Sequence, residues 1–273
     1  MKHALALLCL ALLTACGSGG GGGPVIADIQ ARNLYYGVQA EFIVSGSNLA
    51  TLDNGIVPTI ANCTPPTPAS MVLGQLVFAC SVTAAGELGV QIRDKSGALI
   101  FAKTFTVPAP QVSLDTTMGT MVVELNPGAA PISVNNFLNY VQLGYYSNTL
   151  FHRVVAAFVI QGGGFTAGLV ARPQVFAPIA LESNNGLTNK RGSIAMARTA
   201  DANSATSQFY FNLVDNPALD YQDAANPGYA VFGKIVQGLE VMDAIGAVAT
   251  TTVNGIADVP LTDVLVNSAV RKQ

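Results

Sequence analysis

The chain has 273 residues, of which half are apolar and only 11% are charged, and its formal net charge is −3. This composition excludes a disordered chain and supports a sizeable buried core, in one large domain or two modest ones. The slight negative charge argues against a nucleic-acid-binding protein, because such proteins use basic surfaces to contact phosphates.

The first residues read as an export signal. Lys2-His3 precedes an apolar run from Ala4 to Leu13, which is too short to be a permanent membrane-spanning helix. The run ends in Leu13-Thr14-Ala15-Cys16, which resembles the bacterial lipobox. The resemblance implies removal of residues 1–15 and lipidation of the Cys16 thiol. An ordinary signal peptide with a chance cysteine is the alternative.

Residues 16–23 follow as a glycine-rich tether, which would let the folded part stand off a membrane. The residue after Cys16 is glycine rather than aspartate, and by analogy this favours the outer membrane. We therefore expect a protein of the cell envelope that is lipid-anchored at the outer membrane and faces the periplasm.

Two cysteines, Cys63 and Cys80, remain once the leader and the lipidation site are set aside. In an exported chain two such thiols are expected to form a disulfide. The loop that they close is short, so the chain-entropy model gives a stabilisation of about 3 kcal/mol. Two buried free thiols are the alternative.

Residues 24–108 carry short strand-like runs separated by turn signals, which favours a β-sandwich. Phe42–Leu49 weakly resembles the G-x-N-L strand and turn of immunoglobulin-like domains. No acidic cluster, aromatic stripe or histidine suggests chemistry here, so a spacer or docking role is expected. The predicted strands are residues 41–45, 76–80, 89–93 and 101–105.

Pro108-Ala109-Pro110 marks the predicted boundary, because proline stiffens a linker and stops strands. In the second domain, residues 109–273, Pro131 opens an amphipathic helix that Gly144 ends, and its apolar residues recur at helical spacing. Many strands with two helices favour a β-barrel with helical ends. Strands are predicted at residues 112–115, 120–125, 150–155, 158–161, 192–196, 208–212, 231–236 and 261–270, and a second helix at residues 239–248.

The usual catalytic constellations do not occur in the sequence. A Ser-His-Asp or Cys-His hydrolase needs a histidine base, and His152 is the one histidine outside the leader. One histidine without a C-x-x-C or dense acidic motif argues against a metal site. The glycines at 162–164 lack the Gly-Lys-Ser/Thr of a phosphate loop, and such a run is more often a turn.

Four segments instead occur in a recognisable order: FHRVV…FVIQGGGFT from Phe151, RGSIAMART from Arg191, SATSQFYFNL from Ser204 and YAVFGKIVQGLEVMDAI from Tyr229. They resemble the successive signature segments of cyclophilins, the barrel-shaped peptidyl-prolyl cis-trans isomerases, over about residues 112–270. MARTAD from Met196 is similar to the bacterial periplasmic branch. We therefore expect a mainly β chain, with an immunoglobulin-like β-sandwich followed by a closed antiparallel barrel and two capping helices.

The resemblance also implies which residues form the site. Arg153 matches the arginine that bonds the substrate around the proline, and it is the expected catalytic residue. Gln161 matches a glutamine that touches the substrate backbone and steadies that arginine. Tyr210 matches a position usually held by Phe, and Tyr229 one where many eukaryotic members have histidine. The remaining expected substrate-binding residues are His152, Phe158, Val159, Ala197, Arg198, Gln208 and Leu219.

Isomerisation makes and breaks no covalent bond, so no cofactor, metal or nucleophile is expected. Rotation about a peptide bond costs about 18–20 kcal/mol because resonance must be broken. An apolar pocket disfavours the dipolar planar amide, and a guanidinium near the proline nitrogen stabilises the twisted amide. Arginine suits this role because it stays charged and presents several donors.

Strand alternation places Arg153 and Val155 on one face and His152 and Val154 on the other. Arg153 would then face an outer groove of a filled barrel, and His152 points elsewhere unless the strand bends. Ala218 stands where many family members have a large aromatic residue, so one wall is thinner. We predict weak binding of cyclosporin-type inhibitors, and nanomolar inhibition would contradict that prediction.

The sequence thus predicts isomerisation of X–Pro bonds in exported proteins, assisting their folding. Its expected partners are proline-containing polypeptides of the cell envelope and, through the lipid, the membrane; no nucleic acid is expected, and the protein is expected to be a monomer. One alternative is a binding or chaperone module that keeps the pocket with little catalysis. Another is an anchored adhesin whose β-sandwich binds the ligand.

Overall fold

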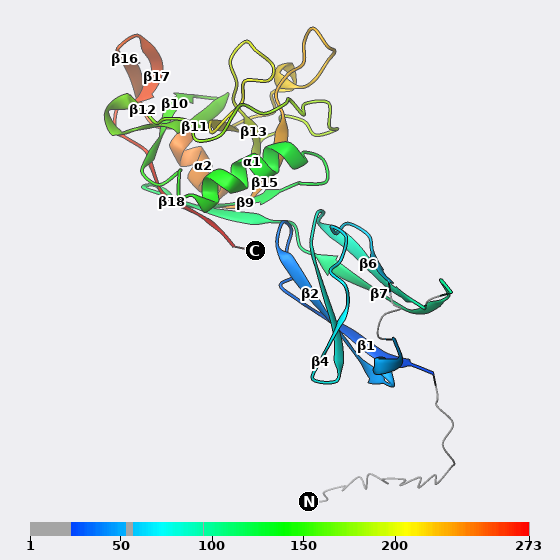
Figure 1. Cartoon of the computed structure of the whole chain (residues 1–273). Coiled ribbons are helices and arrows are strands. Elements are labelled where there is room, and N and C mark those ends of the chain that lie inside the picture. The colour runs from blue at the N-terminus through cyan, green and yellow to red at the C-terminus, as the bar shows by residue number, and fades with distance from the viewer. Residues whose placement is uncertain (1–22, 53–56, 95, 273) are drawn as a thin grey trace, which may run out of the picture.

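The computed structural model describes residues 23–52, 57–94 and 96–272. The predicted signal peptide, the lipidation site Cys16 and most of the tether therefore lie outside the described residues. Figure 1 shows two groups of strands, which we name the N-terminal sheets and the barrel, with the C-terminus close to where they meet. None of the helices in the described ranges has the length and apolar character needed to cross a membrane.

The N-terminal sheets (residues 25–107) are two antiparallel sheets with strand orders β1-β2-β5-β4 and β3-β6-β7. Phe42 stacks on Phe78 at 5.3 Å and meets Phe105 of the other sheet edge-on at 5.7 Å. The two sheets therefore share an apolar core. Their bounds are β1 Val25–Arg32, β2 Gln39–Ser47, β3 Val57–Ile60, β4 Ser70–Val72, β5 Gln75–Ser81, β6 Gly86–Arg93 and β7 Leu99–Val107.

Four of these strands were predicted, whereas β1, β3 and β4 were not. Strand β4 has three residues and β3 contains a proline, so neither gives a strong strand signal. The assignment of this region to the immunoglobulin-like class stays a prediction.

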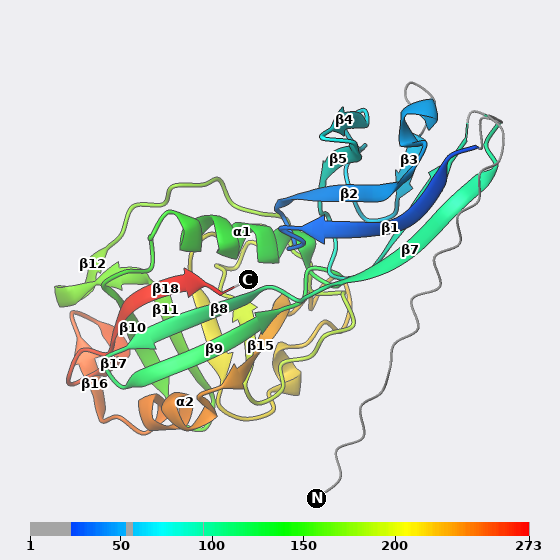
Figure 2. The same cartoon turned by 90° about the horizontal axis from the view of Figure 1, so that it is seen from below.

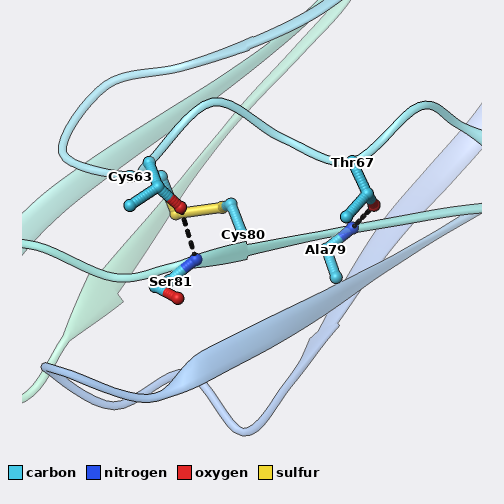
Figure 3. The surroundings of a disulfide bond; sticks show 6 residues. Cys63, Thr67, Ala79, Cys80 and Ser81 are labelled. Carbon is cyan, nitrogen blue, oxygen red and sulfur yellow. Dashed lines mark hydrogen bonds between the residues drawn. A yellow bond between two sulfur atoms is a disulfide. The ribbon is translucent and has the colours of Figure 1, made fainter.

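A disulfide joins Cys63 to Cys80 of β5 (Figure 3). The segment that begins at Cys63 runs along β5, where the Ser81 and Ala79 amides donate to the hydroxyls of Thr64 and Thr67 at 2.9 and 3.0 Å. Strand β4 covers the remainder of the same edge. An open strand edge is a template for unwanted pairing, and here it is covered.

Eight antiparallel strands close the barrel in the order β10-β18-β8-β9-β15-β13-β14-β11, and β11 pairs back with β10. Strand β12 adds to β11 outside the ring. The predicted closed barrel with two helices is confirmed (Figures 1 and 2). The bounds are β8 Gln111–Thr116, β9 Gly119–Leu125, α1 Pro131–Gln142, β10 Thr149–Val155, β11 Val159–Thr166, β12 Val170–Ala171, β13 Ser193–Met196, β14 Phe209–Asn212, β15 Val231–Gln237, α2 Leu239–Gly246, β16 Thr250–Val253, β17 Ile256–Pro260 and β18 Leu265–Arg271.

Helix α1 begins at Pro131 and buries its apolar stripe, as predicted. Phe137 from this stripe reaches Phe209 of β14 and Phe232 of β15, with ring centres 5.6 and 5.4 Å apart. Aromatic side chains thus pack between the helix and the strands. The barrel is filled, so a substrate site must lie on its outer surface.

Two predictions for the barrel were wrong. Gly162–Gly164 lie inside strand β11 rather than in a turn. The residues are glycines because neighbouring segments approach this strand too closely for a side chain. A Cβ on Gly164 would lie 2.5 Å from the Gln208 side chain, and one on Gly163 would lie 2.9 Å from the Ser207 carbonyl. The last strand begins at Leu265 rather than Leu261, because residues 250–260 form the unpredicted β16–β17 hairpin.

The N-terminal sheets contact the barrel through the turn between β1 and β2. The Tyr36 hydroxyl in this turn donates to Asn135 Oδ1 of α1 at 2.7 Å. Arg271 of β18 donates to the Tyr36 carbonyl oxygen. One turn is therefore hydrogen-bonded to both a helix and a strand of the barrel.

Candidate active site

A pocket of about 100 Å³ opens on the barrel beside strands β10, β11 and β14. Its volume lies well below the roughly 300–1,000 Å³ of typical small-molecule sites, so it suits one small side chain or ring. Each of its nine lining residues was predicted from the sequence. They are Arg153, Phe158, Val159, Gln161, Ala197, Arg198, Tyr210, Leu219 and Tyr229.

Arg153 lies on the outer side of β10, and its side chain is 36% exposed. Its Nε lies 3.7 Å from Asp258 Oδ2. Within the described ranges, no hydrogen bond from its guanidinium was found, so both terminal nitrogens are available to a substrate. Asp258 was not predicted, because it belongs to the unpredicted hairpin and lies about a hundred residues from Arg153 in the chain.

The floor of the pocket is apolar. Val159 and Tyr210 are buried and Phe158 packs against them. The Tyr210 hydroxyl donates to Asn189 Oδ1 at 2.7 Å, and Asn189 is not among the residues that line the pocket. Burial raises the pKa of Tyr210, so the hydroxyl keeps its proton and remains a donor. The tyrosine therefore offers the pocket its ring and not its hydroxyl.

One wall of the pocket is held rigidly. The Arg198 guanidinium lies 4.5 Å above the Tyr229 ring and donates to the Gly228 carbonyl at 2.8 and 3.1 Å. The Tyr229 amide donates to the Leu219 carbonyl at 2.9 Å. Gly228 has a positive φ of 62°, and a Cβ there would lie 2.5 Å from the Asp220 backbone. Only glycine lets the two segments approach this closely.

The polar edge of the pocket joins two glutamines. Gln161 lies opposite Arg153 in the β10–β11 register, yet its amide donates to Gln208 Oε1 at 3.0 Å. Gln208 does not line the pocket itself but holds Gln161. The resemblance implied that Gln161 steadies the arginine; in this structure the group beside the arginine is Asp258.

His152 was expected among the substrate-binding residues, and the structure places it elsewhere. It is 5% exposed, its ring lies 4.6 Å from that of Phe165, and its Nδ1 has no hydrogen-bond partner among the described residues. Burial, and secondly the charge of Arg153, lowers its pKa to about 4. As alternation indicated, it points away from the face that carries Arg153.

Larger cavities of about 630 and 650 Å³ lie where the N-terminal sheets meet the barrel. They are lined by residues of both parts, such as Gly86 with Lys234 and Tyr36 with Asn139. Neither reaches Arg153. We therefore take the small pocket as the candidate active site.

Comparison with known proteins agrees with this geometry. Residues 111–271 match the family model described as cyclophilin type peptidyl-prolyl cis-trans isomerase/CLD. Peptidyl-prolyl cis-trans isomerase cyp18 of Streptomyces antibioticus is 46% identical over 160 residues, which is 58% of this chain and 96% of that protein. Peptidyl-prolyl cis-trans isomerase B of Escherichia coli K12 is 44% identical over 159 residues, again 58% of this chain and 96% of that protein.

A solved structure agrees as well. The Cryptosporidium parvum cyclophilin-type peptidyl-prolyl cis-trans isomerase, crystallised in the presence of the dipeptide Ala-Pro, matches with a TM-score of 0.52 and 25% identity. The match covers 60% of this chain and 99% of that one. The chain therefore belongs to the cyclophilin family of peptidyl-prolyl cis-trans isomerases, through its barrel.

Proposed function

We propose that the pocket binds the proline ring of an X–Pro substrate while Arg153 stabilises the twisted amide. One observation carries this proposal: an arginine whose terminal nitrogens have no hydrogen-bond partner among the described residues borders a pocket of single-ring size with an apolar floor. Phe158, Val159 and the ring of Tyr210 would surround the proline. Leu219 would close the remaining side.

The rate enhancement would come from stabilising the rotated state more than the planar one. As the C–N bond rotates, the proline nitrogen becomes pyramidal and regains a lone pair that can accept a hydrogen bond. An arginine donor near that nitrogen therefore gains an interaction that the planar amide does not offer. The apolar floor adds to the effect, because it removes water from the more dipolar planar amide.

The polar edge would hold the rest of the substrate. The wall formed by Ala197, Arg198 and Tyr229 would receive the residues before the proline. The guanidinium of Arg198 is committed to Gly228 and Tyr229, so it would shape this wall rather than bond the reacting amide. Gln161, held by Gln208, would bond the substrate backbone.

The catalytic proposal is tested with Arg153→Ala in the full chain. We expect its kcat/KM on an Ala-Pro peptide to fall by about 100-fold, the usual effect of losing a donor to a transition state. Its free energy of unfolding should change little, because the side chain is partly exposed and its ion pair is a surface one. Equal rates for wild type and Arg153→Ala would reject the proposal.

We further propose that the protein is a lipid-anchored envelope protein whose clients are exported polypeptides. The lipobox-like segment and the pair of cysteines, found joined in the structure, support export to an oxidising compartment. Expression of the full chain in a Gram-negative bacterium tests this. We expect the wild type in the outer-membrane fraction, with a lipid-modified N-terminus by mass spectrometry, whereas a Cys16→Ser variant should lack both properties.

A further inference from the structure

A cluster of buried polar side chains lies directly behind the candidate pocket. Asn189, Tyr210, Asn212 and Asn216 are between 0% and 8% exposed, and Asp220 is half-buried beside them. We name these five residues the Asn189 network. Burying polar groups costs free energy unless their hydrogen bonds are satisfied, so their arrangement needs a reason.

Asn189 is the centre of this network. Its Oδ1 accepts from the Tyr210 hydroxyl at 2.7 Å and from Asn212 Nδ2 at 3.2 Å. Its backbone amide and its Nδ2 donate to Asp220 Oδ1 at 2.6 and 2.9 Å. Its carbonyl accepts from the Asn216 amide at 2.8 Å. One residue thus bonds four others, on β14 and on the loop that follows it.

Three pocket residues are held through this centre. Tyr210, the floor, is bonded to Asn189 directly. Leu219 directly precedes Asp220 in the chain. The Asp220 carboxylate accepts hydrogen bonds from the backbone amide and the Nδ2 of Asn189. Phe158 is linked to Asn189 indirectly, through Asn216, whose Nδ2 donates a hydrogen bond to the Phe158 carbonyl at 3.0 Å.

Leu219 is only partly buried, so these bonds add to its packing against the pocket core. It ends the short 3₁₀ turn Pro217–Leu219, whose residues are not buried. Ala218 beside it has no side chain large enough to pack against the barrel. The turn is therefore held by the packing of Leu219 against the pocket core and by hydrogen bonds, among them those between Asn189 and Asp220.

We propose that Asn189 is a positioning residue for the isomerisation: it sets the distance between the Tyr210 floor and the Leu219 wall, and hence the fit of the pocket to a five-membered ring. It also keeps the Tyr210 hydroxyl away from the substrate. This proposal rests on the proposed role of the pocket. Catalysis is sensitive to small displacements of groups that orient the substrate, so loosening this fit should affect rate and ring selectivity.

The test compares two peptides that differ only in ring size, one with proline and one with its six-membered homologue, pipecolate. For Asn189→Ala we expect kcat/KM on the proline peptide to fall about tenfold, and the proline-to-pipecolate ratio to fall at least threefold. A merely destabilised enzyme would lose activity on both peptides equally. A folded Asn189→Ala enzyme with an unchanged ratio would overturn the proposal.

Two further variants keep the test decisive if Asn189→Ala does not fold. Asn189→Asp keeps the acceptor for Tyr210 but sets a carboxylate against Asp220, so the ratio should again fall; an unchanged ratio would overturn the proposal. Tyr210→Phe keeps the ring but removes its hydrogen bond to Asn189, so the proline-to-pipecolate ratio should fall in the same direction as in Asn189→Ala. An unchanged ratio in Tyr210→Phe would show that this hydrogen bond does not set the fit of the pocket, contrary to the proposal.

Two controls accompany these assays. Thr149→Val removes a buried hydroxyl that donates to the Tyr146 carbonyl at 2.7 Å, outside the network, and should leave the ratio unchanged. Arg153→Ala is assayed in parallel. Equal rates for Arg153→Ala and wild type would reject the pocket assignment, whereas a slowed Arg153→Ala beside an unchanged Asn189→Ala would reject only the role of Asn189.

Discussion

The N-terminal sheets and the barrel are both antiparallel β-structures, but they protect their strand edges differently. The barrel closes its ring through β10 and β11. The N-terminal sheets remain open, and the edge of β5 is covered by β4 and by the disulfide-linked segment that begins at Cys63. A closed ring has no open strand edge to cover. Polar side chains can therefore lie behind a surface pocket of the barrel without leaving a strand edge unpaired.

Breaking the disulfide should have the largest effect, and only on the N-terminal sheets. Cys63 and Cys80 close a short loop, with a sequence separation of 17. A Cys63→Ala/Cys80→Ala variant should therefore lose about 3 kcal/mol of unfolding free energy for that region. Denaturant unfolding of this variant and of the wild type measures the loss, and the rate in an isomerase assay should change less than twofold. A parallel loss of activity would mean that the two regions are coupled.

The barrel should show its own sensitivity, to pH. A histidine whose pKa is about 4 when folded and about 6.5 when unfolded is neutral in the native state, so the unfolded chain binds the proton first as the pH falls. The stabilisation is complete above pH 6.5 and is lost progressively between pH 6.5 and pH 4. We expect a loss of about 2 kcal/mol between pH 7.5 and pH 5, measured by denaturant unfolding.

His152→Gln is the matched variant for this measurement. It removes the one histidine outside the leader, so the loss between pH 7.5 and pH 5 should largely disappear. An equally large loss in His152→Gln would show that other groups cause it.

A smaller effect should follow from removing the carboxylate beside Arg153. Asp258 and Arg153 are 38% and 36% exposed, and such surface ion pairs contribute about 0–1 kcal/mol. We expect Asp258→Asn to change kcat/KM by no more than about fivefold, and added salt to reduce the difference from wild type. Asp263→Asn, which removes an exposed charge five residues away, should have no effect; a matching change there would indicate a general charge effect.

The smallest expected effect is a gain in stability in the turn that precedes the pocket residue Phe158. Ala156-Ala157 stands where the resemblance places the Pro-Gly common in the family, and Ala157 adopts a positive φ of 54°. This conformation is unfavourable for alanine and not for glycine. Ala157→Gly should therefore stabilise the barrel by about 0.5–1 kcal/mol in denaturant unfolding, with activity within twofold of wild type. Destabilisation would show that the entropy of glycine outweighs the relieved strain.

Much of the pocket could be predicted because its residues lie in short contiguous motifs. Alternation along FHRVV placed Arg153 outward and His152 inward, and both are found there. The glycine run was misread because a close approach of Ser207 and Gln208, from a distant part of the chain, explains it. Asp258 and Asn189 were missed because hydrogen bonds and ion pairs between distant segments depend on register and loop course, which no local pattern encodes.

The hydrogen bonds of the Tyr36 turn have a consequence for how the enzyme would meet its clients. Arg271 holds this turn from β18, and β18 pairs with β10, the strand that carries Arg153. The loops between β13 and β15 lie on the side of the barrel away from the N-terminal sheets (Figure 1). If Cys16 is lipidated as proposed, the N-terminal sheets would stand between the lipid and the barrel along the chain, and the Tyr36 turn would help to hold the barrel on them. Weakening the turn would let the barrel swivel, so that the direction of the pocket, rather than its chemistry, would change.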